Sequence, residues 1–75
     1  MNKHELNVRR HLCPMPVIKT QTAIKDMEPG DELTIIATDP GVKHDIPAWA
    51  RIHGHELISI EDDEDDIILK LLVCE

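Results

Sequence analysis

Two prolines near the start of the chain constrain where its first helix can begin. Pro14 and Pro16 precede a segment whose apolar residues recur at helical spacing as far as Met27. Proline is tolerated in the first turn of a helix, where its missing N–H would have no partner, but it disrupts the helix further in. Pro14 is therefore the predicted first helical residue, and Cys13 is the predicted N-cap. A thiol there lies at the positive end of the helix dipole, which favours the thiolate.

The second proline limits the hydrogen bonds that the Cys13 side chain can accept. An N-cap side chain normally accepts from the amides two or three residues further on. Met15 still has its N–H, but Pro16 has none. The sulfur therefore has few local donors, and we expect it to face outward.

Breaks at proline and glycine divide the chain into six predicted elements. Helical spacing predicts a first helix over 14–27, and alternating or β-branched residues predict strands over 5–9, 31–38, 56–61 and 67–74. With a second helix before residue 54, the order is β-α-β-α-β-β. This order favours an α/β (α+β) fold, a two-layer sandwich in which both helices cover one face of a four-stranded mixed sheet.

The second helix has two possible starts. Residues at helical spacing precede a natural stop at Gly54, namely Val42, Ile46, Trp49, Ala50 and His53. Pro47 is costly inside a helix. The simpler account therefore has Asp45 as N-cap, Pro47 in the first turn and residues 41–44 as a preceding turn. The sequence leaves a start near Val42 open.

Length, charge and cysteine content narrow the class of protein. A chain of 75 residues predicts one domain, 1–75, and a domain of this size buries only about 60% of its unfolded surface, so a deep pocket is not expected. The net charge of −7 argues against nucleic acid as a partner, and no apolar run approaches the roughly 20 residues that span a membrane. Without a signal-peptide pattern or a disulfide framework, we expect a reduced, cytoplasmic protein that is monomeric when alone.

Several short motifs, in matching order and spacing over nearly the whole chain, resemble the TusA/SirA-like family of small sulfur-carrier proteins. They are Cys13-Pro14-Met15-Pro16, Glu28-Pro29-Gly30-Asp31, Thr38-Asp39-Pro40, Asp45-Ile46-Pro47 and His55-Glu56-Leu57. The resemblance implies the same β-α-β-α-β-β sandwich. It also implies that the motif cysteine, Cys13, accepts sulfane sulfur as a persulfide and passes it to a partner protein. The expected partners are sulfur-donor and sulfur-acceptor proteins, and no cofactor or metal is expected.

The approach to the motif departs from the family pattern. Many members carry an Asp before the motif and a Gly-Leu pair just upstream of the cysteine, where this chain has Asn7 and Arg10-His11. Glycine often marks an unusual backbone angle. We therefore expect a bulkier, more basic approach to Cys13 and a changed partner.

Residues around Cys13 are candidates for tuning the thiol or contacting a partner. The cations Arg9, Arg10 and Lys19 are expected to favour the thiolate, although Lys19 lies more than a turn and a half along the helix and is equally a partner contact. His11 is either a proton relay or a plain surface residue. The remaining candidates belong to the motif itself, where Met15 is expected to be exposed beside the thiol, between Pro14 and Pro16.

Other residues have competing interpretations. Cys74 is either an incidental strand residue or a resolving thiol for Cys13, and a zinc site from His4, His11, Cys13 and Cys74 lacks the usual ligand spacing. The acidic run 61–66 is either a solvated hairpin connection or a docking patch for a basic partner, and it lacks the ligand pattern of an EF-hand. Core packing is expected for Trp49, a core-edge position for His53, and surface or turn positions for His44 and His55.

The sequence is consistent with three functions. The first is a sulfur carrier or sulfurtransferase acting through a persulfide on Cys13. The second is a regulatory or redox-sensing binding module without sulfur transfer. The third is a two-thiol oxidoreductase that uses Cys13 and Cys74. Residues alone do not identify the pathway, the donor or the acceptor.

Overall fold

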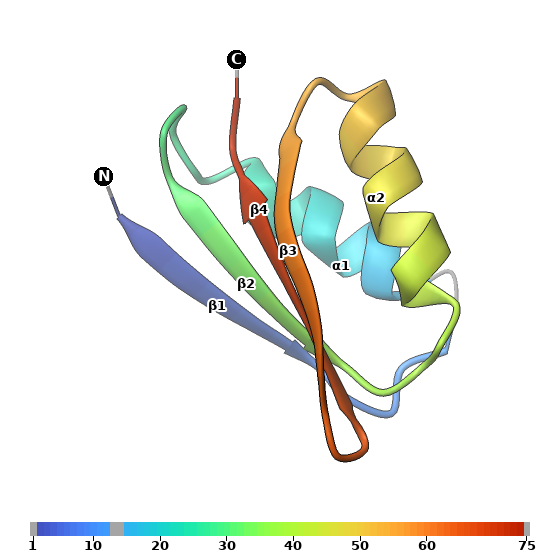
Figure 1. Cartoon of the computed structure of the whole chain (residues 1–75). Helices are drawn as coiled ribbons and strands as arrows, with labels where there is room; N and C mark the ends of the chain where they lie inside the picture. The colour runs from blue at the N-terminus through green and yellow to red at the C-terminus, as the bar shows by residue number, and fades with distance from the viewer. Residues whose placement is uncertain (1, 13–14, 75) are drawn as a thin grey trace.

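Six elements follow one another in the predicted order β-α-β-α-β-β. The computed structural model describes residues 2–12 and 15–74. Its elements are β1 (Lys3–Val8), α1 (Met15–Ile24), β2 (Glu32–Ala37), α2 (Val42–Ile52), β3 (Glu56–Asp63) and β4 (Asp66–Leu72). Both helices cover the same face of a single sheet (Figure 1). The predicted two-layer fold is therefore confirmed.

The sheet is mixed, with strand order β1-β2-β4-β3. β1 runs parallel to β2, and β4 lies antiparallel to both of its neighbours, β2 and β3. Parallel strands need a crossover connection, which α1 supplies between β1 and β2 and α2 supplies between β2 and β3. The register Val8↔Ala37↔Ile67 places the end of β1 at the opposite end of the sheet from Leu72.

The core lies between the two central strands and the helices. One face of β2, one face of β4 and one stripe of α2 are buried: Leu33, Ile35, Ala37, Ile67, Leu69, Leu71, Val42, Ile46 and Ala50. From α1, Pro16 and Thr20 are buried, and the Thr20 hydroxyl donates to the Pro16 carbonyl at 2.8 Å. Both helices are thereby fixed on the sheet.

α2 begins at Val42, so the simpler start at Asp45 is wrong. Val42, Ile46 and Ala50 lie four residues apart and are all buried against the sheet. Pro47 stands inside the helix and half-buried, where it has no N–H for the Lys43 carbonyl. The burial of Val42 offsets that missing bond, which the local rule could not anticipate.

The predicted element ends also move in several places. β1 covers Lys3–Val8 rather than 5–9. α1 stops at Ile24 rather than Met27, because the amides of residues 26 and 27 donate to carbonyls only three residues earlier, those of Ala23 and Ile24. β2 leaves out residues 31 and 38. β4 stops at Leu72 because Val73 bonds the backbone of Gly30 and Asp31, at 2.8 Å each, instead of β3.

Most of the acidic run 61–66 belongs to strands. Asp63 pairs with Asp66 in the ladder, and only Glu64 and Asp65 form the turn, with Glu64 at φ 58°. The hairpin connection is therefore shorter than predicted. Asp62 forms an ion pair with Lys43 at 2.8 Å, so this acidic surface is partly neutralised from within the chain. Neither helix of the described residues is long and apolar enough to cross a membrane.

Candidate functional site

Hydrogen bonds to the end of β1 and to Thr38, just after β2, hold the segment that leads into the motif. The Asn7 side-chain oxygen accepts from the Arg9 amide at 3.0 Å, and the His11 amide donates to the Val8 carbonyl at 3.2 Å. The Arg10 amide donates to the Thr38 hydroxyl at 2.8 Å. Asn7, where many family members are expected to have Asp, thus closes the turn at the end of β1.

Arg10 has an unusual backbone angle. Its φ is 67°, in the left-handed region that glycine adopts without penalty and other residues avoid. This angle fits the glycine that the family resemblance implies here in many members. The Arg10 amide bond to Thr38 holds the strained residue in place. The basic side chain is therefore present despite a local cost in backbone energy.

We expect Arg10→Gly to be more stable than Arg10→Ala by about 0.5–1 kcal/mol, because only glycine relieves the left-handed strain. Urea unfolding of the two variants measures the difference. The matched pair is Gln21→Gly and Gln21→Ala on the exposed face of α1. At this position the glycine variant should be less stable than the alanine variant by about 1 kcal/mol, since glycine weakens a helix interior. Equal stability of the two Arg10 variants would contradict the strain at this residue.

Arg9 is paired with an acidic residue of the hairpin. Its guanidinium donates two hydrogen bonds to the Asp66 carboxylate, each 3.0 Å long. This hydrogen bonding lowers the pKa of Asp66 and raises the pKa of Arg9. The prediction that Arg9 favours the Cys13 thiolate gains no support, because its charge is matched across the sheet by the acidic hairpin.

The start of α1 offers few free amides. The Met15 amide donates to the Leu12 carbonyl at 2.9 Å, and Pro16, in the first turn as predicted, has no N–H. Cys13 and Pro14 lie outside the described residues, so the predicted N-cap and first helical position stay predictions. Leu12 and Met15, on either side of them in the sequence, are both exposed. The exposure expected for Met15 is confirmed, and its position beside the thiol stays a prediction.

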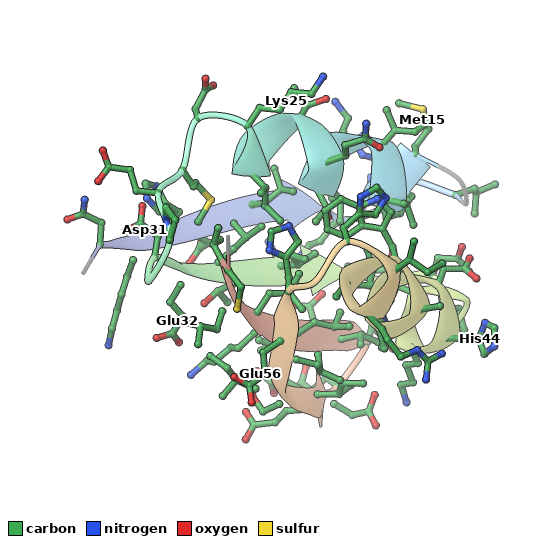
Figure 2. All side chains as sticks on the ribbon, turned by 90° about the horizontal axis from the view of Figure 1, so that it is seen from above. Met15, Lys25, Asp31, Glu32, His44 and Glu56 are labelled. Atoms are coloured by element: carbon green, nitrogen blue, oxygen red, sulfur yellow. The ribbon has the colours of Figure 1, made fainter. Side chains whose placement is uncertain are left out.

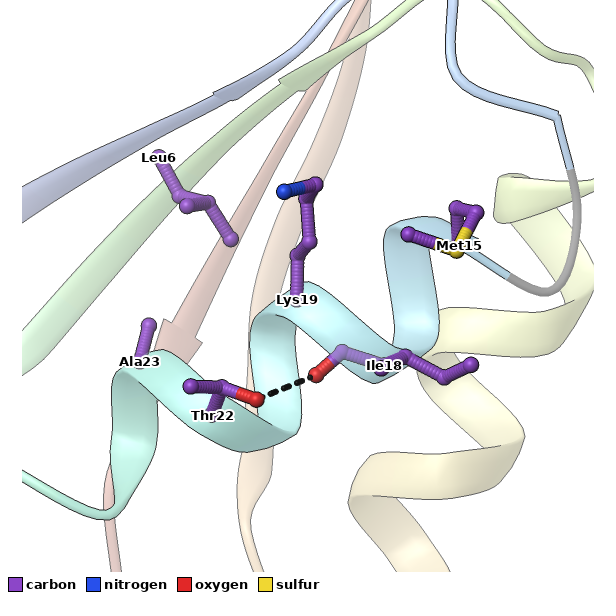
Figure 3. A pocket seen from close by; sticks show the side chains of 6 residues that line it. All are labelled: Leu6, Met15, Ile18, Lys19, Thr22 and Ala23. Atoms are coloured by element: carbon purple, nitrogen blue, oxygen red, sulfur yellow. Dashed lines mark hydrogen bonds between the residues drawn. The ribbon is translucent and has the colours of Figure 1, made fainter.

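Lys19 lies in an open hollow of about 360 Å³ between α1 and β1 (Figure 3). The hollow is lined by Leu6, Met15, Ile18, Lys19, Thr22 and Ala23. Met15 and Lys19 were predicted from the sequence as candidate site residues, and the other four were not. The available signal was that Leu6 faces inward from β1 while Ile18 stands off the buried stripe of α1.

His11 is half-buried, and its ring Nδ1 has no hydrogen-bond partner within residues 2–12 and 15–74. The proton-relay interpretation therefore remains a prediction. Neither His4 nor His44 is a hydrogen-bond partner of this ring nitrogen. His4 contacts the Asp31 carboxylate at 3.2 Å, and His44 is exposed. Among the described residues, no three metal-ligating side chains come together.

Cys74 lies at the other end of the sheet, in contact with His55. Its amide donates to His55 Nδ1 at 3.0 Å, and its Sγ lies 3.5 Å from the Leu72 carbonyl oxygen. His55 occupies the predicted turn but is half-buried. Burial, and secondarily the charge of His53, lower the pKa of His55.

The core-edge position predicted for His53 is wrong. His53 is the exposed C-cap of α2, one residue past the helix and off its buried stripe. Its ring packs instead on Trp49, with centroids 4.7 Å apart, and His55 stacks on the same indole at 5.5 Å. Trp49 itself packs against the core as predicted, although it is only partly buried.

Comparison with known proteins adds evidence on ancestry. The family model described as Sulfurtransferase TusA matches residues 4–73. The chain belongs to the TusA family. A Bacillus subtilis relative of the TusA family, described as "Putative sulfur carrier protein YrkI", is 40% identical over 63 residues, covering 84% of this chain and 83% of that protein.

A second relative extends the match to almost the whole TusA-family domain. This protein from Neisseria meningitidis, also described as a "Putative sulfur carrier protein", is 37% identical over 73 residues, covering 97% of this chain and 96% of its own length. The fold agrees with a solved structure as well. A SirA-like protein from Desulfitobacterium hafniense superposes with a TM-score of 0.83 at 20% identity, covering 96% of this chain and 99% of that chain.

Proposed function

We propose that this chain is a sulfur carrier that accepts sulfane sulfur as a persulfide on Cys13 and passes it to a partner protein. The observation that carries the proposal is the TusA family match over residues 4–73, which spans the Cys-Pro-Met-Pro motif. Relatives described as sulfur carriers support it. The proposed setting is a cytoplasmic sulfur relay, with a donor protein on one side and an acceptor protein on the other.

Each transfer is a thiolate exchange at a sulfane sulfur. The Cys13 thiolate attacks the outer sulfur of the donor's persulfide, forming a new S–S bond while the donor's S–S bond breaks. The donor cysteine leaves as a thiolate and keeps the electron pair. In the second transfer the acceptor's thiolate attacks the outer sulfur on Cys13, and Cys13 is the leaving thiolate. A stabilised thiolate on Cys13 serves both steps, first as nucleophile and then as leaving group.

Features next to the motif fit this exchange. Leu12 and Met15 are exposed, so a partner has access to the chain on both sides of residues 13 and 14. The Met15 N–H already donates to the Leu12 carbonyl, and Pro16 has no N–H. These two positions of α1 therefore offer no free hydrogen-bond donor to retain the transferred sulfur. Such a carrier depends on protein docking rather than on a substrate pocket.

Incubation of the reduced protein with glutathione persulfide tests the proposal. The expected result is a gain of one sulfur atom in the intact mass, with return to the starting mass after treatment with a reducing thiol. Addition of a whole glutathione would instead indicate ordinary disulfide exchange. A protein that gains no sulfur at any donor concentration would disprove the carrier function.

A further inference from the structure

The charges of this acidic protein are distributed unevenly along the chain. Residues 6–25 contain no Asp or Glu, although the whole chain has 15 acidic residues. The same stretch holds four of the eight Lys and Arg residues, namely Arg9, Arg10, Lys19 and Lys25. It forms the end of β1, the approach to the motif and all of α1. The stretch of sequence on both sides of Cys13 is therefore basic within a chain of net charge −7.

Lys19 is the cation of this stretch that lines the hollow. Arg9 is matched by Asp66, and Figure 2 shows Lys25 at the opposite end of α1 from Met15. The half-buried Lys19 side chain rises between Leu6 and Met15 in Figure 3 and has no ion-pair partner among residues 2–12 and 15–74. A partly desolvated ammonium without a carboxylate is a site where an anionic group gains binding energy.

Apolar side chains surround this cation. Met15 is 42% exposed and Ile18 is 48% exposed, and both line the hollow with Leu6 and Ala23. Leu12 is 73% exposed just before the motif. Large apolar side chains that remain exposed around a hollow mark a contact surface. The hollow therefore combines space for one apolar side chain with a single positive charge at its wall.

We propose that this hollow docks the segment of a sulfur-exchanging partner that carries the reacting cysteine, and that this segment is acidic with one apolar anchor residue. The inference rests on the proposed function. The anchor fills the space beside Leu6 and Ala23, and a carboxylate of the segment binds Lys19. Because Met15 lies two residues from Cys13, an anchored segment holds its cysteine near the carrier thiol.

The charge distribution also selects the orientation of approach. An acidic partner is repelled by most of the surface of this protein, whose remaining charges are strongly negative. It is attracted by the basic stretch around α1. Complementary charge raises association rates and suppresses wrong orientations. An acidic segment is therefore attracted to the face that holds α1, and the hollow at Lys19 and Met15 offers it a binding site there.

Three synthetic peptide persulfides test the docking chemistry. Their sequences are Glu-Leu-Gly-Cys-Glu, Lys-Leu-Gly-Cys-Lys and Glu-Ser-Gly-Cys-Glu, and the rate of sulfur transfer to Cys13 is followed by intact mass. At low ionic strength we expect the acidic leucine peptide to react about tenfold faster than the basic one. We expect it to react severalfold faster than the serine peptide. The advantage over the basic peptide should shrink as salt is added.

Charge reversal on the two lysines locates the effect. Lys19→Glu should invert the preference between the acidic and basic leucine peptides, and Lys19→Gln should remove most of it. Lys25→Glu, the same charge change at the far end of α1, should leave the order unchanged. Met15→Ser should remove the advantage of leucine over serine. Thermal unfolding of each variant checks that the fold is retained.

The outcomes separate this inference from the proposed function. Transfer from all three peptides at equal, salt-independent rates would overturn the docking site and leave the carrier function standing. A preference that Lys19→Glu and Lys25→Glu alter equally would also overturn it, because the hollow would then not be the binding site. Absence of transfer from every peptide and from glutathione persulfide would overturn the carrier function, and the docking proposal with it.

Discussion

Cys13→Ser is expected to abolish sulfur uptake, whereas Cys74→Ser keeps the uptake of the parent protein. A serine hydroxyl does not ionise near neutral pH and forms no persulfide, so the first variant has no carrier atom. Cys74 is a matched control because it is the only other cysteine of the chain. Intact mass after incubation with glutathione persulfide measures both variants, and the expected gain is one sulfur atom only where Cys13 is present.

The position of Cys74 explains why we expect it to take no part in sulfur uptake. It follows β4 at the end of the sheet where Lys3, Glu32 and Leu72 align, while residues 9–12 leave β1 at the other end. Its amide is held by His55, away from the approach to the motif. An oxidoreductase that pairs Cys13 with Cys74 requires the two Cα atoms within about 7 Å. Loss of two hydrogens under mild oxidation, absent in Cys74→Ser, would contradict the single-thiol carrier.

Leu69→Ala is expected to lower the free energy of unfolding by about 2–5 kcal/mol. Leu69 is 0% exposed at the centre of the core, on the strand between β2 and β3. Truncation leaves a cavity that neighbouring strands and helices fill only in part, which adds to the lost burial of apolar surface. A domain of this size has a total stability of roughly 4–11 kcal/mol. The variant should therefore unfold near ambient temperature or at low urea.

Ile68→Ala provides the comparison for Leu69→Ala on the same strand. Ile68 faces the other side of the sheet and is only half-buried, so its truncation leaves no enclosed cavity and should cost about 1 kcal/mol or less. Urea unfolding followed by the fluorescence of Trp49, the only aromatic residue among Phe, Trp and Tyr, measures both variants. Similar losses for the two variants would contradict the assignment of the core to the helix-covered face.

The order and type of the elements were predictable because they follow from local patterns. Alternating and β-branched residues predicted strands where β2 and β4 lie, and one of the two alternating sets in each strand is buried. The prolines of the motif predicted that α1 starts beside them, with Pro16 in its first turn. The left-handed angle of Arg10 was not predicted, although many family members are expected to have glycine at this position.

The errors arose where distant contacts overrode local preference. Pro47 argued for a late start of α2, but burial of Val42 on the sheet favours the longer helix. Helical spacing placed His53 at the core edge, whereas α2 ends before it and the ring stacks on Trp49. Val73 looked like strand, yet its backbone bonds the turn at residues 30 and 31. Each outcome depends on the neighbours that packing supplies.

The sequence by itself identified residues 13–16 as the motif from which the function is inferred. The motif, its family and the β-α-β-α-β-β order all follow from residue types at short spacing. Only the tertiary structure decided how charge is arranged around it. It directed Arg9 to Asp66, 57 residues away, and left Lys19 beside an apolar hollow formed with Leu6. Pairing between residues far apart in the chain depends on the packing of α1 on the sheet, which no local pattern encodes.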